Sequence, residues 1–184
     1  ALTGGGGPLM GNLYLFGYRK MWKLVPTGEV TAAYQRITLR SDIGCIRHQS
    51  IVLAEDEDGR PALYWLSHIG PFRTGANGIQ YVGRDIEDLW ATINLAATGV
   101  VCWGLFVPDL HQIWWFVSTG SSQNNPDEKW VYDCRLGRFV EIQGHAGVRY
   151  GWARHTGESC EARHGCLFSN TLGASMSRDL KPYV

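Results

Sequence analysis

The sequence predicts an all-β fold, and three observations favour it. Short apolar or alternating runs are separated by Gly, Pro, Asn and Asp, while a period of 3.6 residues is almost absent. The 184 residues include 23 glycines and 8 tryptophans, which is typical of many short segments joined by glycine turns. Apolar residues make up 45% of the chain and aromatic residues 12%, so the chain can bury a core and is not intrinsically disordered.

The first half of the chain contains short strand candidates in succession. They cover 12–19, 21–25, 34–39, 45–53, 62–67 and 78–82. The acidic run 55–58 followed by Gly59 predicts a hairpin tip, because Asp-Gly favours tight turns. Glycines break up the stretch 70–83, which leaves 78–82 as its only strand candidate. Residues 1–11 are expected to be a flexible glycine-rich start, since the glycine run lacks the spacing of a phosphate loop.

One short helix is expected in a connection, over 85–93. Ile86, Leu89, Trp90 and Ile93 recur at the i, i+3, i+4 and i+7 spacing of a helical apolar face. Asp85 precedes them and is a natural N-cap residue.

The second half of the chain reads as an antiparallel meander. Its strand candidates cover 99–107, 111–118, 129–135 and 139–142, with a polar loop at 119–128. Trp114 and Trp115 are adjacent, so in a strand they point to opposite faces and cannot form one sugar-stacking platform. The candidates 148–155 and 166–169 then begin a further unit.

These strands repeat with a period of about 45 residues, which is typical of four-stranded β-propeller blades. Unit starts can be placed at Cys45, Val101 and Val148, and the aromatic strands at 13–16, 63–66 and 113–116 are alike in character. The prediction is about four antiparallel blades, of which the terminal ones are incomplete. Their approximate units are 12–44, 45–98, 99–146 and 147–184. A partial ring would expose blade faces and strand edges, so we expect self-association or further blades outside this chain.

Several short motifs spread over most of the chain resemble propeller-containing structural proteins of tailed bacteriophages. They are Gly44-Cys45, Ser50-Ile51-Val52, Leu63-Tyr64-Trp65-Leu66-Ser67, Gly70-Pro71-Phe72, Gly78-Ile79-Gln80, Asp85-Ile86, Gln112-Ile113-Trp114-Trp115 and Val131-Tyr132-Asp133. The resemblance implies a segment of a virion component at the tail or head-to-tail junction, without catalytic residues. It also implies a virion as the location, after synthesis in the host cytoplasm.

Composition excludes several classes of partner. The 17 Lys and Arg residues balance the 17 Asp and Glu residues, so no basic field is present to bind nucleic acid. No stretch approaches the roughly 20 apolar residues of a membrane span, and the glycine-rich start is not an intact signal peptide. The cysteines are an odd, scattered set of five, three of them within apolar runs, and this predicts buried thiols made in a reducing compartment.

No residues are predicted to be catalytic, cofactor-binding or metal-binding. Cys160, His164 and Cys166, with His155 nearby, match no standard zinc spacing, so a loop with incidental cysteines is expected. The acidic run 55–58 lacks the ligand spacing of a calcium loop. Asp133 and Glu141 are the carboxylate pair considered for glycoside hydrolysis, but we interpret them as turn residues at strand ends.

The sequence therefore predicts a non-enzymatic structural and interaction protein. Its expected partners are other copies of itself or other virion subunits, and no cofactor is expected. The alternative is a glycan-binding or glycan-cleaving propeller used in receptor recognition. Contacts would then lie on the loops at 119–128 or 73–78, and Asn124 and Asn125 are the residues whose substitution tests this alternative.

Overall fold

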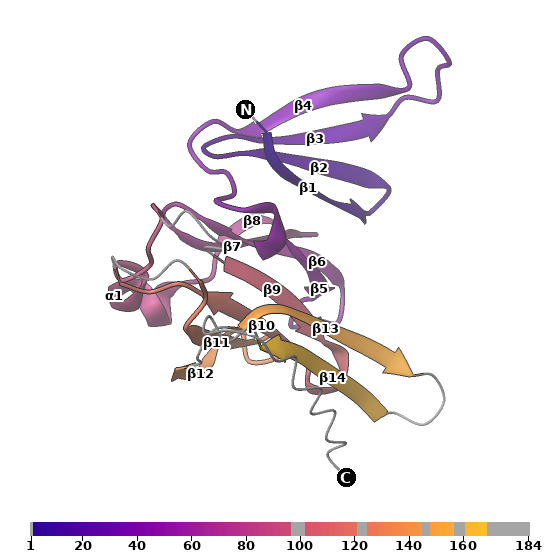
Figure 1. Ribbon diagram of the computed structural model, residues 1–184. Helices are drawn as coiled ribbons and strands as arrows, with labels where there is room; N and C mark the ends of the chain where they lie inside the picture. The colour runs from indigo at the N-terminus through magenta and orange to yellow at the C-terminus, as the bar shows by residue number, and fades with distance from the viewer. Residues whose placement is uncertain (1, 97–101, 121–124, 145–147, 157–160, 169–184) are drawn as a thin grey trace.

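The computed structural model of the chain is an all-β structure built from successive antiparallel sheets (Figure 1). It describes residues 2–96, 102–120, 125–144, 148–156 and 161–168, and gives side chains for 2, 4–96, 102–120 and 125–142. In this part of the chain, three sheets have four strands each, in sequence order, as expected of propeller blades. We call them blades 1, 2 and 3.

The blades follow one another along the chain. Blade 1 consists of β1 (Leu2–Leu9), β2 (Asn12–Gly17), β3 (Met21–Pro26) and β4 (Tyr34–Arg40). Blade 2 consists of β5 (Val52–Glu55), β6 (Pro61–Ser67), β7 (Gly70–Gly75) and β8 (Gly78–Tyr81). Blade 3 consists of β9 (Cys102–Val107), β10 (Gln112–Val117), β11 (Glu128–Asp133) and β12 (Arg138–Gly144). A two-stranded sheet of β13 (Val148–Thr156) and β14 (Glu161–Phe168) follows.

Short helical segments occupy the connections. They are the 3-10 helices η1 (His48–Ser50), η2 (Arg84–Ile86) and η3 (Pro108–Leu110), and the helix α1 (Glu87–Trp90). The first strands of the units contact one another in succession, β1 with β5, β5 with β9 and β9 with β13. This arrangement of first strands is the propeller-like feature of the fold.

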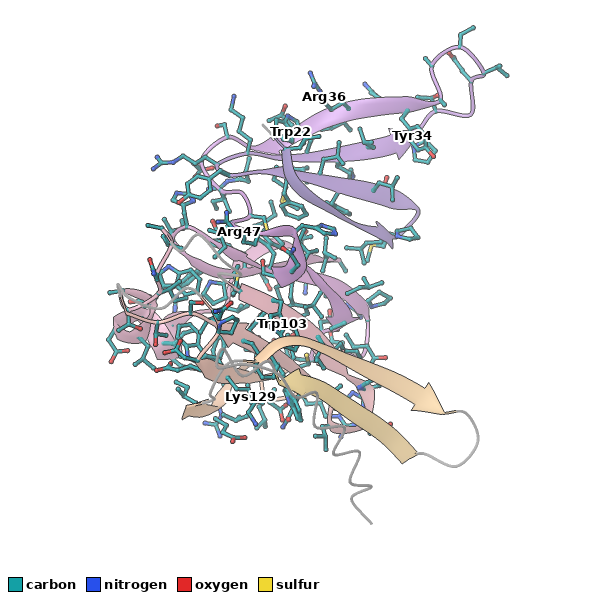
Figure 2. All side chains as sticks on the ribbon, viewed as in Figure 1. Trp22, Tyr34, Arg36, Arg47, Trp103 and Lys129 are labelled. Atoms are coloured by element: carbon teal, nitrogen blue, oxygen red, sulfur yellow. The ribbon has the colours of Figure 1, made fainter. Side chains whose placement is uncertain are left out.

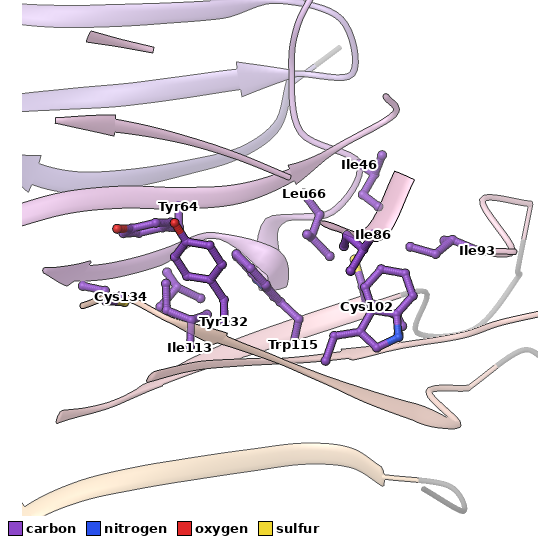
Figure 3. Packing of buried hydrophobic residues seen from close by; sticks show 14 of the residues in the cluster. Ile46, Tyr64, Leu66, Ile86, Ile93, Cys102, Ile113, Trp115, Tyr132 and Cys134 are labelled. Atoms are coloured by element: carbon purple, nitrogen blue, oxygen red, sulfur yellow. The ribbon is translucent and has the colours of Figure 1, made fainter. Parts of the chain in front are cut away.

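Blade 2 is buried on both faces. Along β6, Leu63 and Trp65 belong to the core shared with blade 1, whereas Tyr64 and Leu66 belong to the core shared with blade 3. The alternation follows from the period of two in a strand, and it explains why β6 is apolar at almost every position. Figure 3 shows part of the core between blades 2 and 3, where Tyr64 and Leu66 face Trp115 and Tyr132.

The aromatic strands predicted from the sequence have equivalent places in the structure. The segments 13–16, 63–66 and 113–116 lie in β2, β6 and β10, the second strand of each blade. Trp115 is fully buried between blades 2 and 3, while Trp114 packs on the other face of blade 3 beside Trp103 and Phe116. The prediction that the two adjacent tryptophans point to opposite faces is confirmed.

The prediction of a flexible start over residues 1–11 is wrong for Leu2–Leu9, which form β1 and pair with β2. Glycine is needed there because blade 2 approaches closely. A Cβ atom on Gly6 would lie 2.8 Å from Ile51 Cγ2 and 3.1 Å from Leu63 Cδ1, and one on Gly4 would lie 2.9 Å from Ile51 Cδ1. Blade 1 therefore begins at Leu2, before the expected unit 12–44.

Three further predictions are corrected. The expected strand 45–53 is a strand only from Val52, because η1 occupies part of the connection before it. Residues 70–75 form β7, although their glycines argued against a strand. The helix over 85–93 is the short pair of η2 and α1, and no side chain caps either N-terminus, so Asp85 is not an N-cap.

Candidate functional site

Two surfaces of the structure are candidates for function. The first is the open face of blade 1, defined by Leu13, Leu15, Trp22, Leu24 and Tyr34 on the side of the sheet opposite blade 2. Leu13 pairs with Leu24 and Leu15 with Trp22 across β2 and β3, so these four side chains share one face. Phe16 and Met21 form a cross-strand pair on the opposite face, and both side chains pack in the core between blades 1 and 2.

The open face is apolar yet belongs to no core among the described residues. Leu13 is 38% exposed and Tyr34 53% exposed, and the other three side chains are half-buried. Figure 2 places Trp22 and Tyr34 in blade 1, with Arg36 of β4 nearby. Arg36 is paired with Leu24 and so adds a charge to this face. An apolar sheet face of this kind is typical of an interaction surface.

The second candidate is the interblade cleft, an open cavity of about 410 Å³ between blades 2 and 3. Blade 2 and η2 provide most of one wall, and the β11–β12 hairpin of blade 3 provides the other. Its lining residues are Glu57, Arg73, Gln80, Tyr81, Val82, Arg84, Asp85, Tyr132, Gly137 and Arg138.

Arg73 is a charged group of the cleft that is fixed by two side-chain partners. Its guanidinium forms an ion pair with Glu57, and its Nε donates a hydrogen bond to Gln80 Oε1 at 2.8 Å. Arg73 and Gln80 are direct neighbours across β7 and β8, so the strand pairing itself positions this contact. Burial lowers the pKa of Arg73, but hydrogen bonds to Glu57 and Tyr64 outweigh it and the pKa is raised. Arg73 therefore stays charged and fixed in place.

Tyr132 on β11 places a buried hydroxyl without a hydrogen-bond partner among the described residues at the cleft. It is fully buried, it lines the cleft, and its hydroxyl is the one buried side-chain polar atom without a hydrogen-bond partner in the part of the chain that the structure describes. Burial raises the pKa of this hydroxyl; Arg73 acts to lower it, and Glu57 and Asp85 act to raise it further. The ring is held by Tyr64, with centroids 5.6 Å apart, and by Phe139, at 5.2 Å.

The turn between β11 and β12 brings blade 3 against the β5–β6 hairpin of blade 2. Gly137 has φ of 64°, a left-handed conformation that favours glycine, and a Cβ atom there would lie 2.8 Å from Glu57 Oε1. Arg138 follows directly and lines the cleft. Arg84 and Arg138 are exposed, and neither forms an ion pair with another described residue.

The interblade cleft could not be predicted from the sequence, because its residues come from segments far apart in the chain. Arg73 lay in one of the loops considered for binding, 73–78, but Arg73–Gly75 belong to β7 and Gly78 begins β8.

The carboxylates considered for glycoside hydrolysis have structural partners. Asp133 Oδ1 accepts hydrogen bonds from the backbone N–H groups of Arg135, at 3.0 Å, and Leu136, at 2.9 Å, so Asp133 is the turn residue that was predicted. Glu141 instead lies within β12 and forms an ion pair with Lys129 at 3.5 Å.

The acidic run 55–58 forms a hairpin tip, as predicted. Asp56 Oδ1 accepts hydrogen bonds from the backbone N–H groups of Asp58 and Arg60. In the described ranges no three His, Cys, Asp or Glu side chains gather as metal ligands. Cys160 lies outside the described residues, and the side chains of His155, His164 and Cys166 are also outside the description.

The polar loop at 119–128 is partly described. The Asp127 carboxylate accepts a hydrogen bond from the Thr119 backbone N–H at 2.7 Å and another from Thr119 Oγ1 at 2.9 Å, which closes the base of the loop. Asn124 lies outside the described residues, so the glycan-binding prediction at Asn124 and Asn125 stays a prediction.

Cys45, Cys102 and Cys134 are buried and form no disulfide, as the apolar runs around them predicted. Within the described ranges, no helix has the length and apolar character needed to cross a bilayer. No protein-family model matches this chain, and no curated protein matches it either.

Proposed function

We propose that this chain is a non-enzymatic interaction protein that assembles through the open face of blade 1. The observation that supports the proposal is the apolar character of this face. No other described residues pack over it, whereas both faces of blade 2 pack in cores. A further sheet that covered the open face of blade 1 would stabilise the blade by about 25 cal/mol per Å² of apolar surface buried.

The proposed occupant of the open face is a second copy of the chain. The formal net charge is zero, so two copies do not repel one another through their overall field. The proposed setting is a bacteriophage virion, and that part of the proposal rests on the sequence resemblance alone.

The experiment is a measurement of solution mass by light scattering on a sizing column, over a range of concentrations. We expect a discrete multiple of 20.5 kDa. Leu15→Glu places a charge on the open face between Trp22 and Gly5, where no basic cross-strand partner compensates it, and should weaken association by about tenfold or more, since burying such a charge is costly.

Leu136→Glu is the matched control, because Leu136 is 58% exposed in the β11–β12 turn of blade 3. It should leave the mass unchanged. A monomer at every concentration, or equal effects of the two variants, would overturn assembly through this face.

A further inference from the structure

We propose that the interblade cleft binds a small ligand that carries one carboxylate and several hydroxyl groups, chemically an acidic sugar. This site is separate from the open face of blade 1, so the inference does not depend on the proposed assembly. Its volume of about 410 Å³ lies in the range of small-molecule sites.

The charges of the cleft favour a monoanion. Three arginines face two carboxylates, which leaves one net positive charge. Arg73 is already engaged by Glu57 and Gln80, so Arg84 and Arg138 are the two guanidinium groups available to a ligand. A planar guanidinium matches a carboxylate through two parallel hydrogen bonds, and a doubly charged phosphate would exceed the positive charge that the cleft offers.

The remaining polar groups favour hydroxyls on the ligand. The buried Tyr132 hydroxyl can donate one hydrogen bond and accept another, and no described residue uses it. A buried polar group of this kind is destabilising until it is paired, so a ligand or solvent hydroxyl that reaches it is stabilised there. The Asp85 carboxylate accepts hydrogen bonds from hydroxyl groups, and the amide nitrogen of Gln80 donates them.

The position of the cleft also suits a ligand site. The walls of the cleft are formed by β7 and β8 of blade 2 and by β11 of blade 3, which contains Tyr132. Residues of β7 and β8 pack in the core between blades 1 and 2, and Tyr132 packs in the core between blades 2 and 3. Arg84 begins η2 and Arg138 begins β12. Groups held on a rigid scaffold lose little freedom when a ligand binds.

The test is isothermal titration calorimetry of the full chain with three probes: D-glucuronate, D-glucose and inorganic phosphate. Glucuronate should bind, and glucose, which lacks the carboxylate, should bind about tenfold or more weakly because the charge-assisted hydrogen bonds are lost. Phosphate should also bind more weakly than glucuronate. Equal binding of glucose, tighter binding of phosphate, or no heat with glucuronate at millimolar concentration would overturn the proposal.

Variants assign the binding to the cleft. Arg138→Gln should weaken glucuronate binding about tenfold, whereas Arg135→Gln, on the same hairpin but outside the lining of the cleft, should leave it unchanged. Tyr132→Phe removes only the unpartnered hydroxyl, so it should weaken binding severalfold while the melting temperature of the free protein stays the same or rises. If glucuronate binds equally to wild type, Arg138→Gln and Tyr132→Phe, the cleft is not the site. The solution mass of these variants should match wild type, so failure here is distinguishable from failure of the assembly proposal.

Discussion

At the scale of residues, a tryptophan of blade 2 and a tryptophan of blade 3 both bond to the connection between blades 1 and 2. Trp65 Nε1 of β6 donates a hydrogen bond to Gly44 O at 3.0 Å, and Trp115 Nε1 of β10 donates one to Ser50 O, also at 3.0 Å. In each case a buried indole on the second strand of a blade reaches the backbone of the connection that precedes blade 2. Each tryptophan therefore buries a large apolar ring and also donates a hydrogen bond to a backbone carbonyl.

Trp115→Ala should lower the free energy of unfolding by about 3–5 kcal/mol, because it leaves a cavity and an unpaired carbonyl in the core. Trp114→Ala is the control on the neighbouring position, where the side chain is only half-buried, and it should lower stability less. Urea unfolding followed by fluorescence measures both. Equal losses in the two variants would contradict the placement of Trp115 in the core.

Stability should fall at alkaline pH because of buried thiols. Burial raises the pKa of Cys45 to about 11, above its value of about 8.5 in an unfolded chain. The unfolded state therefore releases this proton first as pH rises, and unfolding becomes easier by up to about 1.4 kcal/mol per pH unit between about pH 9 and 11. The contribution of this thiol is fully present below that window.

The measurement is urea unfolding at several pH values for wild type and Cys45→Ala. The variant should show a shallower decline over the same window, because it lacks the thiol. Parallel curves for the two proteins would show that Cys45 is not responsible.

At the scale of elements, β1 is a strand made possible by the absence of side chains. Its glycines pair with Leu15, Phe16 and Tyr14 of β2 and let blade 1 approach η1 and β6. Glycine weakens an isolated strand, so tertiary contact is what stabilises this one. Leu9 at its end is buried in the core between blades 1 and 2.

Gly6→Val should destabilise the fold by about 1–3 kcal/mol, since the new side chain would collide with Ile51 and Leu63. Gly5→Ala is the control in the same strand, because its Cβ atom would meet only Tyr14 O at 3.3 Å and the Leu15 side chain at 3.5 Å. Thermal melting distinguishes them. A flexible start would tolerate both changes, and that outcome would contradict the observed strand.

At the scale of the whole molecule, blade 2 is the centre of the described structure. The core on one of its faces is shared with blade 1 and the core on the other with blade 3. Within the described ranges, other residues cover only one face of blade 1, and its last strand β4 is exposed along most of its length. Stability is therefore expected to decrease from blade 2 toward the edge of blade 1.

Hydrogen exchange followed by mass spectrometry should reflect this gradient. Amides of β6, which pairs with β5 and β7 and is almost fully buried, should exchange most slowly, and amides of β4 should exchange early. Slow exchange in β4 at low protein concentration would contradict the gradient. If protection of β4 increases with concentration, association through blade 1 would explain it.

Most of the strands, their antiparallel order and the opposite faces of Trp114 and Trp115 could be predicted from the sequence. These features depend on neighbours along the chain, since side chains alternate in a strand and glycine or aspartate marks the turns between strands. The repeat of an aromatic second strand was also visible in the sequence, because in every blade at least one face of this strand packs in a core.

The glycine strand β1, the strand β7 and the interblade cleft became visible only in the folded chain. For β1 and the cleft, the contacts join segments far apart in sequence: Gly6 lies against Leu63, and Gly137 against Glu57. A glycine run has the same local preference in a linker as in a strand pressed against another blade. Likewise, arginines 73, 84 and 138 line one cleft only because two sheets pack face to face, and that packing is not encoded by any local spacing.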